Sequence, residues 1–184
     1  MTRWAHYSQP EDRRENTLTH SLDSVILAAV MLKIEDEQGV GSQIDHSKIL
    51  LTAAIHDFGE GTIGDVAYRV KNDPRVRDAL GAIEKEEVYK IFEGLSPSLR
   101  EMFLQAYDVV EQDSVGGEFF NAVECVGYVF FAITQLEATD LKFVEVLKRQ
   151  HSKLVELGKK FASVRVLYLE PYKEYVEKLI QTPE

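Results

Sequence analysis

The chain has 184 residues, of which 45% are hydrophobic and 28% are charged. This length and composition are typical of one globular domain with a substantial core. The formal net charge of −10 argues against a nucleic-acid polymer or an anionic membrane surface as the main partner. A small phosphorylated ligand stays compatible with this charge, because a bound cation can reverse the local field.

Cysteine usage and hydropathy indicate the cellular setting. The single Cys125 cannot form an internal disulfide, which favours a reducing, cytoplasmic location. The first residues lack the basic start and apolar stretch of a signal peptide. The longest apolar run, residues 123–133, is shorter than the roughly 20 residues that a membrane-spanning helix needs. We therefore expect a cytoplasmic protein without a membrane partner.

The first part of the chain shows helical periodicity. Apolar residues at three- and four-residue spacing predict a helix from about residue 18 to Gly39, with Thr17 or Thr19 as its cap. Asp45 is the expected cap of a second, largely apolar helix over residues 47–57, which we place at the centre of a bundle. The stripe of the first helix that is expected to face the core consists of Leu22, Val25, Ile26, Ala29, Val30, Leu32 and Ile34.

The rest of the chain also predicts helices. Residues 58–65 read as a glycine-broken stretch, and residues 66–71 predict one or two helical turns. Further helices are expected from Pro74 to residue 92, from a Ser96 cap to residue 110, and over residues 119–136, 140–161 and 170–180, with Gly116 and Gly117 as a separator. We predict an all-α bundle of about seven or eight helices. It forms one domain over residues 1–184, with a core of about 14–136 on which helices within 140–181 pack.

Two adjacent residues with metal-binding side chains, His56 and Asp57, end the second predicted helix. Imidazole and carboxylate suit a first-row metal such as Mn, Fe, Co or Zn, and His20 could supply a second imidazole. Taken alone, each histidine is more often an ordinary core or surface residue. The doublet favours a metal site, because burying both groups without a compensating charge is costly.

Glu124 is the candidate for a further ligand. It stands in an otherwise apolar helix, where an unpaired carboxylate is costly or takes up a proton. The alternative places Glu124 on a solvent-facing polar stripe with Asn121 and Tyr128. The residues alone do not decide between these two interpretations.

Together these motifs resemble the HD-domain phosphohydrolases, in particular the branch of YfbR-type 5′-deoxynucleotidases. The resemblance rests on Arg14-Glu15-Asn16 ahead of His20, on His56-Asp57 followed by Glu60 and Gly64-Asp65, and on residues 82–85. It implies an HD-domain helical bundle that removes the 5′-phosphate from deoxynucleoside monophosphates. It also implies a homodimer.

The resemblance further implies a set of metal ligands. His20, His56 and Asp57 match family ligands of a divalent metal ion, which could be Mn, Co, Fe, Zn or Mg. Glu124 stands at the fourth position, where the family has Asp. This departure keeps carboxylate chemistry but adds one methylene group, so the metal must shift or the helix must sit back.

Other positions match catalytic and substrate-binding residues of the family. Glu60 matches the catalytic carboxylate, and Asp65 matches a residue that contacts the sugar or positions water. Arg3 and Trp4 match a pair that contacts the nucleotide, with a spacing to His20 that is two residues longer. Lys71 stands where a phosphate-binding lysine would be useful, although a solvated lysine is the more usual interpretation.

Two other functions stay open on the sequence. The basic residues Arg69, Lys71, Arg75 and Arg77 are compatible with an HD-domain triphosphohydrolase of deoxynucleoside triphosphates. The departure at Glu124 is compatible with a nucleotide-binding HD module of weakened catalysis. The presence of both Glu60 and Asp65 favours an enzyme over a binding module.

Overall fold

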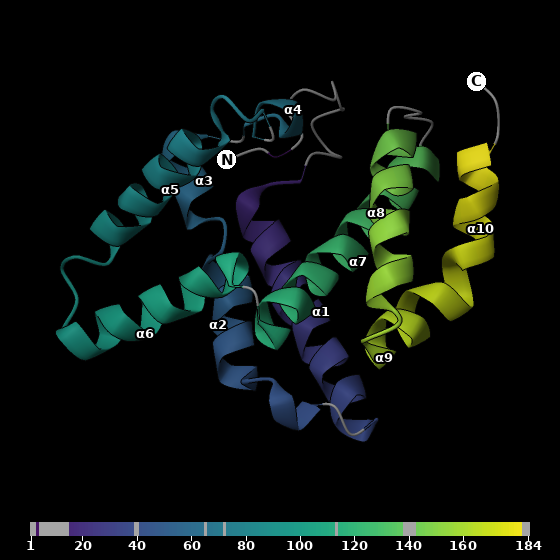
Figure 1. Ribbon diagram of the computed structural model, residues 1–184, viewed down its shortest axis with the longest axis horizontal. Coiled ribbons are helices and arrows are strands. Elements are labelled where there is room, and N and C mark those ends of the chain that lie inside the picture. Colours follow the sequence, from purple (N-terminus) through teal and green to yellow (C-terminus); the bar gives the residue numbers. More distant parts are fainter. Residues whose placement is uncertain are drawn as a thin grey trace.

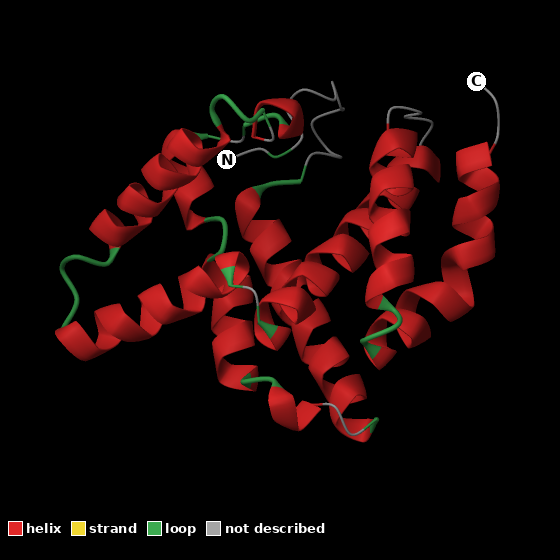
Figure 2. Ribbon diagram, viewed as in Figure 1, coloured by secondary structure: helices red, strands yellow, loops and turns green. Residues whose placement is uncertain are grey.

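The computed structural model describes residue 3 and residues 15–38, 41–64, 66–71, 73–112, 114–137 and 143–181. Every regular element in these residues is a helix, so the predicted all-α fold is confirmed (Figure 2). Eight of the described α-helices have six or more residues, which agrees with the predicted seven or eight.

Three helices build the centre of the molecule: α1 (Thr17–Glu37), α2 (His46–Ile55) and α7 (Val115–Glu137). The short α3 (Phe58–Ile63) follows α2 and packs against the helix of residues 77–91. Helix α7 crosses α1, and α2 packs along α1 (Figure 1). At one end lie α5 (Arg77–Ile91) and α6 (Pro97–Tyr107), and at the other lie α8 (Val144–Leu157) and α10 (Glu170–Gln181). The shorter segments are η3 (Gly41–Gln43), α4 (Tyr68–Lys71), η4 (Asp108–Glu111), α9 (Ala162–Val164) and the π-helical η6 (Arg165–Leu169).

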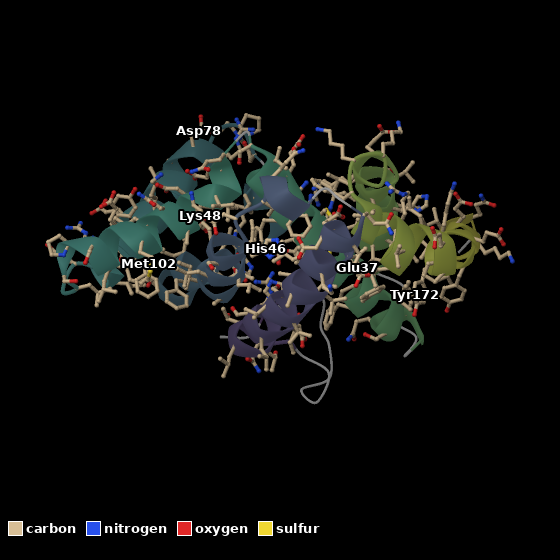
Figure 3. The ribbon with its side chains drawn as sticks, turned by 90° about the horizontal axis from the view of Figure 1, so that it is seen from below. Glu37, His46, Lys48, Asp78, Met102 and Tyr172 are labelled. Atoms are coloured by element: carbon tan, nitrogen blue, oxygen red, sulfur yellow. The ribbon has the colours of Figure 1, made fainter. Side chains whose placement is uncertain are left out.

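Side chains mark the two ends of the molecule. Met102 of α6 and Tyr172 of α10 lie on opposite sides, and His46 at the start of α2 lies between them (Figure 3). His46 pairs with Asp36 of α1 at 3.2 Å and is about 40% exposed. It therefore joins α1 to α2 at the molecular surface.

Two hydrophobic clusters hold α2 in place. The larger one joins α1, α2, α7, α8 and the C-terminal segment around buried Phe119, Phe120, Phe143, Phe161 and Tyr168. The smaller one joins the end of α2 to α5 and α6 through Ile55, Val88, Phe92 and Ala106. Because α2 contributes to both clusters, packing fixes its C-terminal end, where His56 and Asp57 follow.

The start of α1 differs from the prediction in one detail. The N-cap is Asn16, whose side chain accepts a hydrogen bond from Thr19 N at 3.0 Å, while Thr19 Oγ1 accepts one from Asn16 N at 3.2 Å. The predicted cap at Thr17 or Thr19 was therefore wrong, because Thr19 is the reciprocal partner of a capping box. The predicted cap of α2 is confirmed, since Asp45 accepts from Lys48 N at 3.0 Å.

The face of α1 that was predicted to be buried is largely exposed. Leu22, Ile26 and Val30 are 58%, 54% and 45% exposed. By contrast, His20 and Ser24 on the opposite face are buried. The prediction was wrong for these three residues, because the polar face of α1 carries groups that pair with distant residues. It holds for Leu32, which is 3% exposed and part of the larger core cluster.

Several glycines that were predicted to break or separate helices lie inside helices. Gly116 and Gly117 lie inside the first turn of α7 and do not separate two helices. A Cβ at Gly117 would lie 2.2 Å from Gln112 O, so this turn needs a glycine. Residues 58–63 form helix α3, and the chain leaves it at Gly64 with a φ of +92°.

Two helices, Thr17–Glu37 and Val115–Leu136, are long and apolar enough to cross a membrane by length and composition alone. The helix around residues 123–133 is longer than the apolar run, so the shortness of that run does not exclude a span. Within the protein, 56% of the α7 window is buried, because α7 is the central helix of the core.

Candidate active site and metal centre

Two imidazoles face each other where α1 approaches the end of α2. The Nε2 atoms of His20 and His56 are 3.2 Å apart. Each ring is held from behind: His20 Nδ1 lies 3.2 Å from Glu15 Oε1, and His56 Nδ1 lies 3.0 Å from Ala53 O. Because Nδ1 donates a proton outwards, each imidazole turns its Nε2 atom into the site, as metal-binding histidines do.

Two carboxylates converge on the same point. Glu124 Oε2 lies 3.3 Å from His20 Nε2 and 3.5 Å from His56 Nε2. The nearest Asp57 oxygens lie 3.6 Å and 3.4 Å from the same two atoms. Ligand atoms about 2.0–2.2 Å from one ion lie about 3.0–3.5 Å from each other. The donor set therefore fits a divalent metal ion, with His20, His56 and Glu124 as the tightest group.

The charges around the imidazoles favour a cation. Burial lowers the pKa of His20, but hydrogen bonds with Glu124 and Glu15 outweigh it and raise the pKa to about 9. Burial raises the pKa of Glu124, but the His56 and His20 imidazoles lower it well below its usual range. The pocket thus keeps Glu124 ionised and favours positive charge beside it.

Glu124 does not face solvent, so the alternative of a polar surface stripe is wrong. Its side chain is only 11% exposed. While Oε2 faces the imidazoles, Oε1 accepts a hydrogen bond from Ser24 Oγ at 2.8 Å. Tyr128, one turn further along α7, stacks on His20 with ring centroids 5.9 Å apart and planes 6° apart.

Arg3 reaches into the carboxylates beside the donor set. It forms an ion pair with Asp57, and its guanidinium lies 3.3 Å from both Glu60 Oε2 and Glu15 Oε2. The same guanidinium donates to Tyr128 Oη at 3.3 Å. Arg3 is 7% exposed, so a buried positive charge stands between the metal-binding groups and Glu60.

Glu60 lies between two cations. Lys71 of α4 forms an ion pair with it and also lies 3.4 Å from Glu84 Oε1 of α5. Burial raises the pKa of Glu60, but the charges of Arg3 and Lys71 outweigh this and lower the pKa below its ordinary value. Glu60 is therefore a carboxylate at neutral pH and can accept a proton. Lys71 is paired and half-buried, so its interpretation as a solvated surface lysine is wrong.

A cavity of about 370 Å³ opens beside these groups, a size typical of small-molecule sites. Phe120 and Val110 give it an apolar wall, while Tyr107 and Asn121 add polar groups. The charged end of the cavity is lined by His56, Asp57, Glu60, Lys71, Glu84, Glu111 and Glu124.

The structure brings together most of the predicted site residues and adds three. Two predicted residues, Trp4 and Asp65, lie outside the described residues. Glu15, Ser24 and Tyr128 were not among the predicted site residues. Helical spacing could have found two of them, because Ser24 follows His20 by one turn and Tyr128 follows Glu124 by one turn. The signal for Glu15 is its place in the Arg14-Glu15-Asn16 motif, on which the family resemblance rests.

Comparison with known proteins identifies the family of the chain. A search of curated proteins found no match. A family model described as 5′-deoxynucleotidase YfbR-like matches residues 1–174, which include every candidate site residue. The chain therefore belongs to the YfbR-like 5′-deoxynucleotidase family, HD-domain metal-dependent phosphohydrolases that remove the 5′-phosphate from deoxynucleoside monophosphates.

Proposed function

We propose that the cavity between α2, α3, α5 and α7 is where this enzyme removes the 5′-phosphate from deoxynucleoside monophosphates. In this proposal His20, His56, Asp57 and Glu124 hold the divalent ion. The observation that carries it is the convergence of two imidazole Nε2 atoms, 3.2 Å apart, with two carboxylates at the charged end of the cavity.

The donor set suits Mn, Co, Fe or Zn better than Mg, because imidazole is a ligand of the former. When bound, the ion supplies positive charge for a phosphate oxygen and acidifies a water ligand. All four side chains lie on α1, on α7 or at the end of α2, so packing of the core holds them in place.

Arg3 and Lys71 bind the phosphate in this proposal. Both cations pair with Glu60 inside the site. A phosphate can take the place of this carboxylate, because it accepts charge-assisted hydrogen bonds from the same two side chains. Trp4 and Asp65, outside the described residues, are proposed to contact the nucleotide and its sugar.

Glu60 moves a proton in the reaction. As an ionised carboxylate it accepts a proton from the attacking water while the water oxygen bonds to phosphorus. The bond between phosphorus and the 5′ oxygen breaks, and Glu60 returns the proton to that leaving oxygen. The products are a deoxynucleoside and inorganic phosphate, and Glu60 ends in its starting state.

The distribution of basic side chains supports a monophosphate over a triphosphate substrate. Among the described residues that line the cavity, Lys71 is the only lysine or arginine. Arg75 and Arg77 pair with the acidic neighbours Asp73 and Asp78 and are 86% and 61% exposed. Among the described residues, Arg3 is the other cation at the site, and two cations match one phosphate better than three.

The test is a panel of deoxynucleoside mono- and triphosphates incubated with the metal-loaded protein. We expect inorganic phosphate from the monophosphates, and loss of that release in His56→Ala. His46→Ala is the matched control, because His46 lies at the surface and pairs with Asp36. Release of triphosphate, or full activity of His56→Ala, would contradict the proposal.

The exposed stripe of α1 supports the further proposal of a homodimer. Leu18, Leu22, Ile26 and Val30 recur every fourth residue and are 79% to 45% exposed. In such a dimer the α1 helices of the two copies pack antiparallel and cross near Ile26 and Val30. This arrangement brings Asp23 opposite the partner's Lys33. Sedimentation analysis should show a dimer for the wild type and a monomer for Ile26→Asp.

We also propose that the chain is one domain and acts in the cytoplasm. Contacts of α8 with α7, and of α9 with α1, support a single unit. The one cysteine is buried and free, which suits a reducing compartment. One cooperative unfolding transition and recovery in the cytosolic cell fraction are the expected results.

A further inference from the structure

Ser24 gives one oxygen of the Glu124 carboxylate a partner of its own. It lies on α1 one turn after His20, is 5% exposed, and donates its hydroxyl proton to Glu124 Oε1 at 2.8 Å. The other oxygen, Oε2, lies 3.3 Å and 3.5 Å from the two imidazole Nε2 atoms. Each oxygen therefore has its own partner, and only Oε2 faces the centre of the donor set.

This contact matters because Glu124 is one methylene longer than the aspartate of the family pattern. A longer side chain has an additional rotatable bond, and a free carboxylate can turn both oxygens towards a cation or swing away from it. The hydroxyl of Ser24 removes that freedom from one oxygen. Groups that hold a metal ligand from behind in this way typically change metal affinity by about 10–100-fold.

We infer that Ser24 is a positioning residue that makes Glu124 a one-oxygen ligand of the metal ion. It fixes Oε1 on α1 so that only Oε2 is presented between His20 and His56, which compensates for the additional methylene group. This inference rests on the proposed metal centre. Because α1 carries both His20 and Ser24, one rigid helix sets the position of one ligand and the orientation of another.

The test is binding of Co²⁺ alone to the metal-stripped full-length protein, followed by calorimetry and by the visible absorption of Co²⁺. We expect Ser24→Ala to weaken binding by about 10-fold or more and to change the absorption spectrum, because Glu124 then offers both oxygens. Ser24→Thr keeps the hydroxyl and should restore both readouts. Ser152→Ala is the control, since Ser152 is an exposed helical serine whose hydroxyl donates to Lys148 O.

A double-mutant cycle separates positioning from a general loss of packing. The shorter carboxylate of Glu124→Asp cannot reach both Ser24 and the metal, so Ser24→Ala should have little further effect in that background. Equal losses in both backgrounds would overturn the inference. So would an unchanged affinity and spectrum in Ser24→Ala.

The outcome for the wild type distinguishes this inference from the proposed metal centre. If the wild type and His56→Ala bind Co²⁺ equally weakly, the metal centre itself is wrong and the inference falls with it. If the wild type binds and His56→Ala does not, while Ser24→Ala matches the wild type, only the role of Ser24 is overturned.

Discussion

Lys71 of α4 and Glu60 of α3 form an ion pair at the charged end of the cavity, and Lys71 also lies 3.4 Å from Glu84 of α5. One ammonium group thus joins three helices beside the metal-binding side chains. The pKa of Lys71 is raised, because the Glu60 and Glu84 carboxylates outweigh the lowering effect of burial. Lys71 therefore stays charged at the pH of the reaction.

Lys71→Met tests whether this charge binds the phosphate. We expect kcat/KM for a deoxynucleoside monophosphate to fall by about 10- to 100-fold, since a hydrogen bond to a charged group contributes about 1.5–3 kcal/mol. Steady-state phosphate release measures the change. Arg75→Met is the control and should keep full activity, because Arg75 is 86% exposed and pairs with Asp73. Equal effects of the two variants would contradict a specific role.

Glu60→Gln tests the proton transfer separately from metal binding. Gln keeps the size of Glu60 but cannot accept the proton, so we expect kcat to fall by about 10²- to 10⁴-fold. Calorimetry should show Co²⁺ affinity close to that of the wild type, because Glu60 is not one of the proposed ligands. Glu87→Gln, which changes a carboxylate that pairs with Lys90 at the surface, should leave kcat unchanged.

Metal binding should stabilise the folded protein. An ion at 100 times its dissociation constant adds about 2.7 kcal/mol to the free energy of unfolding. For a chain of this size that corresponds to a rise in Tm of roughly 5–10 °C. Thermal scans with and without Co²⁺ measure the rise, which His20→Ala should abolish and His46→Ala should keep. A shift of equal size in His20→Ala would place the bound ion elsewhere.

Local sequence cues predicted where helices begin better than they predicted which helix faces are buried. Asp45 at the start of α2, and Ser96 with Pro97 at the start of α6, carry their signal within a few residues. The His56-Asp57 doublet was informative for a similar reason. An imidazole and a carboxylate, both costly to bury, directly follow a buried helix.

The buried face of α1 could not be predicted in this way. His20 and Ser24 are buried because Glu124, about 100 residues later, pairs with both. Glu35 is also buried, and its Oε1 pairs with Ser163, 128 residues away. Such long-range partners leave no trace in the period of α1, so its apolar stripe was taken for the core face.

Tyr107 gives a pH-dependent prediction. Burial, with a contribution from Glu84, raises the pKa of its phenol to about 12. In the unfolded chain this pKa is about 10. The folded state therefore favours the neutral phenol, and its stabilising contribution is full below pH 10 and lost as the pH rises through 12.

Urea unfolding at pH 8 and pH 11 measures this effect. Because Phe cannot ionise, Tyr107→Phe should lose less stability than the wild type between these two values. Tyr172→Phe is the control, since Tyr172 is 39% exposed on α10 and its variant should lose as much as the wild type. Parallel behaviour of Tyr107→Phe and the wild type would refute the assignment.

Glu35 links the end of α1 to the C-terminal helices. It is fully buried, and its Oε1 accepts hydrogen bonds from Ser163 N at 2.7 Å and Ser163 Oγ at 2.6 Å. Glu35→Ala leaves both buried donors without this acceptor, so we expect a loss of about 2–4 kcal/mol in the free energy of unfolding.

Ser163→Ala removes only the hydroxyl and keeps the backbone bond to Glu35. Its cost should be about 1–2 kcal/mol, clearly below that of Glu35→Ala. Urea unfolding of the two variants and of the double variant measures the difference. Because a chain that lacks the carboxylate has no acceptor for the Ser163 hydroxyl, the double variant should be about as stable as Glu35→Ala alone. Additive losses would show that the two residues act independently, and the link between α1 and α9 would then depend on apolar packing.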